Sequence, residues 1–168
     1  MVLANCEIPR MLLWLCDMAD SSLTPAPSRI LAIDFGTRNM GLAVTDPLGM
    51  TAQGLPTYRR SNKKADFDYL RRLIRQYEVR EIVMGLPLRM SGDEGIQAGK
   101  VQAFAEELRA KFKLPLHLFD ERLTSVEANR VLRETEMSGR RRAEVVDQLA
   151  AVLILQAFLE YRRASKSE

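Results

Sequence analysis

Residues 30–45 have the sequence ILAIDFGTRNMGLAVT, and this stretch decides the class of fold. Its first four residues, 30–33, form a continuous apolar run of the kind that a central strand buried on both faces requires. The run ends at Asp34, a polar turn follows, and residues 41–45 form a second apolar segment. After another turn, residues 50–57 have the composition of a third strand. We therefore expect three consecutive antiparallel strands.

The rest of the chain alternates helices and strands. Apolar residues at helical spacing predict a first helix over residues 67–77 and a second over residues 101–112. Short apolar runs predict strands at residues 82–84 and 116–119, and two more helices end the chain, the last with an apolar stripe over residues 146–161. Helices that connect successive strands favour parallel pairing. The prediction is an α/β fold with a mixed five-stranded sheet, three antiparallel strands and then parallel ones, with helices on both faces.

Composition and charge exclude several classes of protein. The 168 residues are 46% hydrophobic and 28% charged, as in a single globular domain and unlike a disordered protein. No apolar run approaches the roughly 20 residues that span a bilayer, and the run at residues 11–16 is far too short. Residues 1–28 hold one arginine and three acidic residues, so the remainder carries a net charge of +5 within the total of +3. That charge permits a polyanionic partner.

Residues 1–28 are expected to lie outside the domain. They hold both cysteines, Cys6 and Cys16, so no disulfide framework or thiolate metal site can stabilise the domain, and a reducing cytoplasm is the expected location. The segment lacks a basic start and a clean cleavage site, which argues against a signal peptide. Two interpretations stay open: translation begins at Met18, or the segment is a loosely attached extension. We expect a poorly ordered extension at 1–28, a domain at 29–163 and a tail at 164–168.

Three carboxylates stand where predicted elements would bring them together. Asp34 and Glu121 follow the first and fifth strands, and the carboxyl ends of parallel strands are where α/β sheets bind ligands. Asp147 borders the apolar stripe of the last helix, where Ala150 and Ala151 would let that helix approach the sheet closely. Carboxylates without histidine or cysteine suit Mg²⁺ or Mn²⁺. Two such ions can activate a water for phosphodiester hydrolysis, so we expect a metal-dependent site there.

Each of these carboxylates also has a simpler structural explanation. Asp34 could cap the turn that follows it, Glu121 could form a surface ion pair, and Asp147 could be a solvated helix residue. His117 alternates with leucines on a predicted strand, so a structural role is the better interpretation of it. Only the joint placement of the three carboxylates at one edge of the sheet favours the metal site.

Basic residues flank the same region. The arginines at 140–142 come immediately before the predicted last helix, and Arg59–Arg60 and Lys63–Lys64 flank the start of the first helix. Guanidinium groups bind phosphates through paired hydrogen bonds, so such a cluster suits a nucleic-acid backbone, with a solvated charged face as the alternative. The glycine-rich loop 88–99 is a candidate flap. The candidate nucleic-acid-binding residues are Thr37, Arg38, Arg89, Arg122, Arg140, Arg141 and Arg142.

Four segments, in this order and spacing, resemble the YqgF/RuvX family of bacterial RNase H-like proteins: IDFGTRNMGLAVTD, IVMGLPLRMSG, FDERLTSVEA and VVDQLAAVLIL. The resemblance spans about residues 29–162. It implies an RNase H-like fold similar to Holliday junction resolvases, metal-dependent phosphodiester cleavage, and a cytoplasmic pre-16S rRNA nuclease that matures the 5′ end during ribosome assembly. The family's acidic residues fall on Asp34, Glu121 and Asp147. Arg89 is a departure, because the family often has asparagine there.

The leading hypothesis is a nuclease that uses Mg²⁺ or Mn²⁺, with a two-metal site, on precursor rRNA in ribosomal assembly intermediates. The alternatives are a Holliday junction resolvase-type endonuclease acting on branched DNA and a non-catalytic rRNA-binding assembly factor. Residues 34–37, DFGT, also resemble the phosphate-binding hairpin of sugar kinases and actin-like ATPases. Those proteins normally place the nucleotide between two domains, and 168 residues suffice for one. We expect a monomer or homodimer with no membrane partner.

Overall fold

The computed structural model describes residues 29–87, 95–120 and 139–165, and the fold is given for these residues. In chain order the elements are β1 (Arg29–Phe35), β2 (Asn39–Thr45), β3 (Ala52–Arg59), α1 (Lys63–Gln76), β4 (Val79–Leu86), α2 (Ile96–Phe112), β5 (Leu116–Asp120) and α4 (Gly139–Ala164). The first of the two helices predicted after residue 119 lies outside the described residues. None of the described helices is both long enough and apolar enough to cross a membrane.

The five strands form one mixed sheet in the order β3-β2-β1-β4-β5. β2 pairs antiparallel with both β1 and β3, whereas β4 pairs parallel with both β1 and β5. The predicted sheet is therefore confirmed. Short turns connect the first three strands and force antiparallel pairing, while α1 and α2 are the long crossovers that parallel pairing requires.

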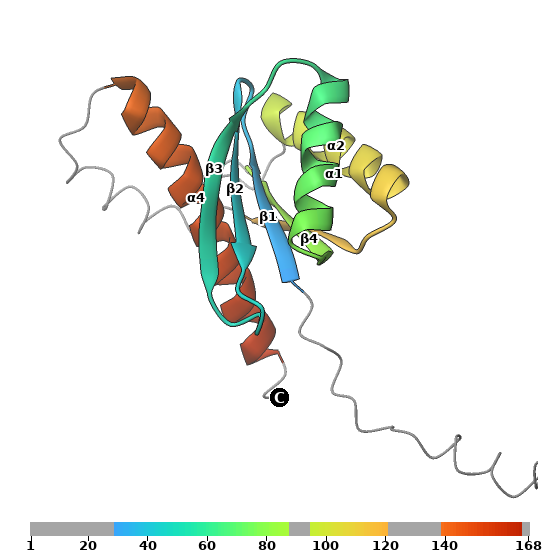
Figure 1. The fold of residues 1–168 in the computed structure, drawn as a ribbon, viewed down its shortest axis with the longest axis vertical. Helices are drawn as coiled ribbons and strands as arrows, with labels where there is room; N and C mark the ends of the chain where they lie inside the picture. Colours follow the sequence, from blue (N-terminus) through green and yellow to red (C-terminus); the bar gives the residue numbers. More distant parts are fainter. Residues whose placement is uncertain (1–28, 88–94, 121–138, 166–168) are drawn as a thin grey trace, which may run out of the picture.

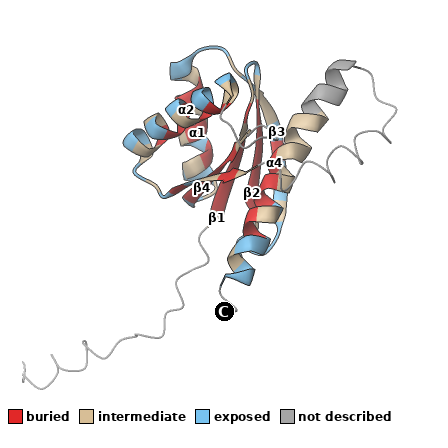
Figure 2. Ribbon diagram, turned by 180° about the vertical axis from the view of Figure 1, so that it is seen from behind, coloured by how far each residue is buried: buried red, intermediate tan, exposed pale blue. Residues whose placement is uncertain are grey.

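Helices cover both faces of this sheet, with α1 and α2 on one face and α4 on the other (Figure 1). Side chains of β1 alternate between the two layers, because successive residues of a strand point to opposite faces. Leu31 and Ile33 pack with α1 and α2, whereas Ile30 and Ala32 pack under α4. Figure 2 shows the strands as the buried layer between the helices.

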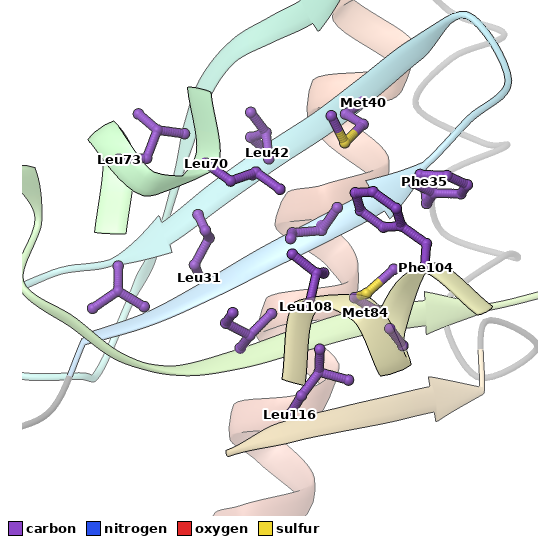
Figure 3. Close-up of a cluster of buried hydrophobic side chains, with 14 of the residues drawn as sticks. Leu31, Phe35, Met40, Leu42, Leu70, Leu73, Met84, Phe104, Leu108 and Leu116 are labelled. Atoms are coloured by element: carbon purple, nitrogen blue, oxygen red, sulfur yellow. The ribbon is translucent and has the colours of Figure 1, made fainter. Parts of the chain in front are cut away.

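The larger hydrophobic core lies between the sheet and α1 and α2. Figure 3 shows leucines, methionines and phenylalanines from all these elements packed together there. Phe35 stacks on Phe104 with 4.3 Å between ring centroids, and Phe67 stacks on the same ring at 5.3 Å. Under α4 a smaller core contains Ile154, Leu155 and further apolar residues. Full burial of one such side chain stabilises the folded state by about 1.5–3 kcal/mol. The many side chains packed on both faces therefore keep the sheet in place.

Most strands are longer or shifted relative to the sequence-based expectation, and the contacts explain two of these differences. β1 continues through Asp34 to Phe35, because Asp34 is paired with Gly41 in the ladder with β2. β3 begins at Ala52, two residues later than expected. The reason is Asp46, whose carboxylate accepts hydrogen bonds from the amides of residues 50 and 51 and so keeps both in the turn.

The helices also begin earlier than their apolar stripes, and two of these starts affect candidate functional segments. α4 begins at Gly139, so the three arginines at 140–142 lie in its first turn and not before the helix; arginine is a good helix former and nothing interrupts the segment. α2 begins at Ile96, so the last residues of the candidate flap are helical, with the amide of Gly99 donating to the carbonyl of Gly95 at 3.2 Å. Residues 88–94 of that loop lie outside the described residues.

Candidate active site

Asp34 is the last residue of β1 on the face that α4 covers. Ile30 and Ala32 lie in the core beneath α4, and the alternation along a strand extends this row to Asp34. Its neighbour Phe35 is anchored in the opposite core by its stacking on Phe104. The partly buried side chain of Asp34 therefore projects from a rigid strand toward the α4 side.

α4 touches β2 at Gly41, the residue paired directly with Asp34. A Cβ atom on Gly41 would lie 1.9 Å from the carbonyl oxygen of Asp147, closer than any real contact, so only glycine permits this approach. The sequence indicated that alanines in the helix would allow close packing, and Ala151 is indeed fully buried. In the sheet, the missing side chain of Gly41 leaves room for the backbone of α4 at Asp147. Because Gly41 is paired with Asp34, this close approach makes Asp34 and Asp147 neighbours on one face.

Asn39 holds the carboxylate of Asp147. Its Nδ2 donates a hydrogen bond to Asp147 Oδ2 at 2.8 Å. Asn39 begins β2 on the same face as Gly41, so this bond directs the carboxylate toward the end of β1 at which Asp34 lies. Sequence reasoning did not identify Asn39, because its partner lies 108 positions further along the chain. The one available signal was a polar residue two positions before Gly41.

The described part of the site supplies two carboxylates from different elements. No group of three or more His, Cys, Asp or Glu side chains that could hold a metal occurs among the described residues. Glu121, the third predicted carboxylate, follows β5 directly and lies outside them. A site built from oxygen donors alone fits Mg²⁺ or Mn²⁺ better than zinc. The Asn39 amide orients the Asp147 carboxylate by a hydrogen bond, as groups behind the ligands of a metal site commonly do. The donor set present therefore fits the predicted kind of ion.

The predicted nucleic-acid-binding residues fall into two groups. Thr37 and Arg38 form the exposed turn between β1 and β2, directly after the strand that carries Asp34. Of the arginines at 140–142 only the helical backbone is described, and Arg89 and Arg122 lie outside the described residues. The structure thus brings Thr37 and Arg38 close to the carboxylates. Binding of nucleic acid stays a prediction for all seven residues.

Arg60 fixes the turn that presents Thr37 and Arg38. Its guanidinium donates to the carbonyl oxygen of Gly36 at 2.8 Å and to Asp66 Oδ2 at 2.9 Å. It also lies 4.1 Å from the centroid of the Phe35 ring. The Asp66 side chain is only 1% exposed, and a buried carboxylate is costly without a cation beside it. Arg60 is therefore a structural residue.

His117 has the structural role expected from its alternation with leucines. Its Nε2 lies 2.7 Å from Glu81 Oε1, and the other carboxylate oxygen of Glu81 accepts a hydrogen bond from Arg162 at 2.6 Å. The imidazole also packs 5.2 Å from the Phe158 ring. These contacts join β4, β5 and the C-terminal part of α4.

Comparison with known proteins identifies one family. The family model described as "RuvX: Holliday junction resolvase" matches residues 28–161. A protein of Koribacter versatilis named "Putative pre-16S rRNA nuclease" is 61% identical over 140 residues, which cover 83% of this chain and 92% of that protein. A protein of Moorella thermoacetica with the same name is 54% identical over 132 residues, 79% of this chain and 94% of its own length.

A solved structure shows the same fold. The RuvC protein of T. thermophilus in complex with a Holliday junction substrate superposes with a TM-score of 0.53, covering 82% of this chain and 96% of that chain. The sequences are 12% identical. A likeness at this identity concerns the fold alone, which is the RNase H-like fold that the sequence predicts.

Proposed function

The chain belongs to the RuvX family of Holliday junction resolvase-like proteins, and on that premise we propose that it is a metal-dependent nuclease that hydrolyses pre-16S rRNA. The two relatives described above support rRNA as the substrate through their names. The observation that supports catalysis in this chain is the meeting of Asp34 and Asp147 on one face of the sheet, with Asn39 holding Asp147. The proposed place of action is the cytoplasm, in maturation of the 5′ end on ribosomal assembly intermediates.

Asp34, Glu121 and Asp147 are the residues that would hold one or two Mg²⁺ or Mn²⁺ ions. Such ions, when bound, supply an activated water and stabilise the leaving oxygen of a phosphodiester. The protein contributes geometry: Asp34 is fixed by the strand pairs of β1, and Asp147 is fixed by the hydrogen bond from Asn39. Carboxylates that are already oriented need no rearrangement when the substrate binds, which lowers the barrier to reaction.

The substrate backbone would be bound by the exposed turn beside these carboxylates. Arg38 can form paired hydrogen bonds with a phosphate, and the Thr37 hydroxyl can donate another. The turn itself is held in place by Arg60. Arg89, Arg122 and the arginines at 140–142 are proposed to bind further phosphates from the adjoining segments. In this arrangement positive side chains surround a small acidic centre.

Asp34→Asn and Asp147→Asn test the proposal. Each variant keeps the size of the side chain and removes its charge, so we expect the melting temperature to change little. Cleavage of a 5′-extended 16S rRNA precursor in Mg²⁺ or Mn²⁺ should fall by at least about 100-fold, because the charge that holds the cation is gone. Full cleavage by both variants would contradict the assignment.

The family description favours a second candidate function, cleavage of branched DNA by the same carboxylates. Competition separates the two: labelled precursor rRNA is incubated with an excess of an unlabelled four-way DNA junction, and the converse. Cleavage of the rRNA that resists the junction supports the rRNA nuclease. Preferential cleavage of the junction supports the resolvase, and binding of rRNA without cleavage of either supports an assembly factor.

A further inference from the structure

Arg59 and Arg60 are consecutive in sequence, but their side chains lie on opposite faces of the sheet. Tyr58 packs against the core formed with α1 and α2, so Arg59, the next residue of β3, points to the α4 face. Arg60 returns to the first face, where its guanidinium lies against Phe35. Of the two arginines, only Arg59 shares a face with Asp34 and Asp147.

The register of β2 and β3 places Arg59 beside the candidate active site. Arg59 is paired with Asn39, and directly paired residues of antiparallel strands have Cβ atoms about 4.5–5.5 Å apart on one face. Asn39 is the residue that holds Asp147 at 2.8 Å. Across the end of the sheet, from β3 to β1, the α4 face therefore presents a cation, the Asn39–Asp147 pair and Asp34.

Arg59 is exposed and has no acidic partner among the described residues. It does not pair with Asp147, although the residue that holds Asp147 is its direct neighbour across the ladder. Several other arginines of the described chain have carboxylates of their own: Arg60 with Asp66, Arg71 with Asp68, Arg109 with Glu106 and Arg162 with Glu81. Within the described part of the chain, no carboxylate therefore competes with an outside anion for the guanidinium of Arg59.

The backbone under Arg59 is held firmly by the residue that follows it. The amide of Arg60 donates to the carbonyl oxygen of Arg38 at 2.9 Å, and its guanidinium binds Gly36 and Asp66. The end of β3 is therefore tied both to the β1–β2 turn and to α1. Arg59 extends from a fixed point, and only its side chain has to be ordered when a ligand binds.

We propose that Arg59 binds a phosphate of the substrate strand next to the scissile one, so that the strand runs from the carboxylates across β2 and leaves the sheet at β3. β3 is an edge strand, and two strand spacings, about 10 Å, separate it from β1. A guanidinium at that place can bind one phosphate through paired hydrogen bonds. Arg59 contributes to binding and register, not to the bond cleavage. This inference rests on the proposed nuclease function.

Arg59→Ala tests it, with Arg80→Ala as the matched control. Arg80 is also an exposed arginine of a strand, but it lies at the opposite end of the sheet, about 15 Å from Asp34 along the strands. The dissociation constant of a fluorescein-labelled RNA with the 5′ precursor sequence of 16S rRNA is measured over a range of salt. Single-turnover cleavage at saturating protein is measured on the same RNA.

Arg59→Ala should weaken binding about 10-fold and reduce the slope of log affinity against log salt by about one, because one phosphate contact is lost. The cleavage rate at saturation should stay within about twofold of the wild type. Arg59→Lys should restore the salt slope and part of the affinity, since it keeps the charge and loses the paired geometry. Arg80→Ala should match the wild type.

Unchanged affinity and salt slope in Arg59→Ala would overturn the inference, as would equal weakening in Arg80→Ala or a loss confined to the saturated cleavage rate. None of these results would contradict the proposed function. That function is tested separately in the same assay, by cleavage with the wild type and its loss in Asp34→Asn. Absence of RNA binding by the wild-type protein would overturn both.

Discussion

At the scale of single residues, the site depends on a neutral amide that orients a charged carboxylate. Asn39 gives Asp147 one hydrogen bond at 2.8 Å and adds no charge. A lysine or arginine in the same place would orient the carboxylate equally well. Its positive charge would also offset the negative charge of the carboxylate, and so compete with a bound metal ion. The choice of asparagine is therefore consistent with a carboxylate kept available for a metal ion.

Replacement of Asn39 by alanine should lower activity without unfolding the protein. Removal of an outer-shell partner typically costs about 10–100-fold in metal affinity or activity, so Asn39→Ala should cleave precursor rRNA more slowly and need more Mn²⁺ for half-maximal activity. Titration of the cleavage rate with Mn²⁺ measures both effects. The melting temperature should change by only a few degrees, since the lost bond is partly exposed.

Asn62→Ala is a suitable control for this experiment. Asn62 caps α1 by accepting a hydrogen bond from the amide of Ala65 at 3.0 Å, so its loss should cost about 1 kcal/mol of stability with the Mn²⁺ requirement unchanged. If Asn39→Ala showed the wild-type rate and Mn²⁺ dependence, the hydrogen bond to Asp147 would have no part in the reaction.

Single residues also show what could be predicted of the site. Asp34 and Asp147 were predicted because each marks a place that the pattern alone defines, the end of an apolar strand and the border of an apolar helical stripe. Asn39 could not be found in this way, and Arg59 stood out only as part of a basic pair with Arg60, without a place relative to the carboxylates. The role of Asn39 comes from a contact with a residue 108 positions away, and that of Arg59 from the register of β2 on β3. Neither feature can be recognised in the local periodicity of the sequence.

At the scale of elements, a glycine in the sheet sets how closely α4 lies on β2. Gly41→Ala would put a Cβ 1.9 Å from the main-chain carbonyl oxygen of Asp147, so the helix or the strand must move. Overpacking of this kind costs about 1–3 kcal/mol or more. We expect Gly41→Ala to lower stability in urea denaturation and to lower cleavage as well, because Asp147 moves away from Asp34.

Gly99→Ala gives the opposite expectation and serves as the control. Gly99 lies within α2, and a Cβ there would meet nothing within 4 Å. Alanine is the better helix former, so this variant should gain about 0.5–1 kcal/mol with cleavage unchanged. Equal effects of the two substitutions on stability would show that the contact at Gly41 does not constrain α4.

The order and pairing of the elements could be predicted because turn length and helical crossovers decide them, as in the antiparallel β1–β2–β3 and the parallel β1–β4–β5 sets. The ends of elements were less accurate, since individual hydrogen bonds determine them. Asp34 extends β1 by pairing with Gly41, and Asp46 delays β3 by holding two amides in the turn. The first pairing joins two strands across a turn, and the second is a local turn contact that apolar periodicity does not report.

At the scale of the whole molecule, α4 completes the domain. It packs over β1, β2 and β3 and closes the smaller core with Phe158 and Leu159, both about 5–6% exposed. Near its C-terminus, Arg162 donates to the buried Glu81 of β4. The same helix therefore supplies Asp147 to the site and, near its other end, the hydrogen bond from Arg162 to the sheet. Loss of the contacts at the C-terminal end should also disturb the site.

Deletions from the two ends should consequently differ in effect. Among the described residues, both hydrophobic cores fall within 30–159, and the family match begins at residue 28. Removal of residues 1–28 should therefore leave the melting temperature within about 2 °C and cleavage unchanged. Truncation after Gln156 removes Phe158, Leu159 and Arg162. It exposes apolar surface worth several kcal/mol and leaves the Glu81 carboxylate without its arginine, so this variant should unfold at much lower temperature and lose activity. A large destabilisation on removal of residues 1–28 would instead make that segment part of the folded domain.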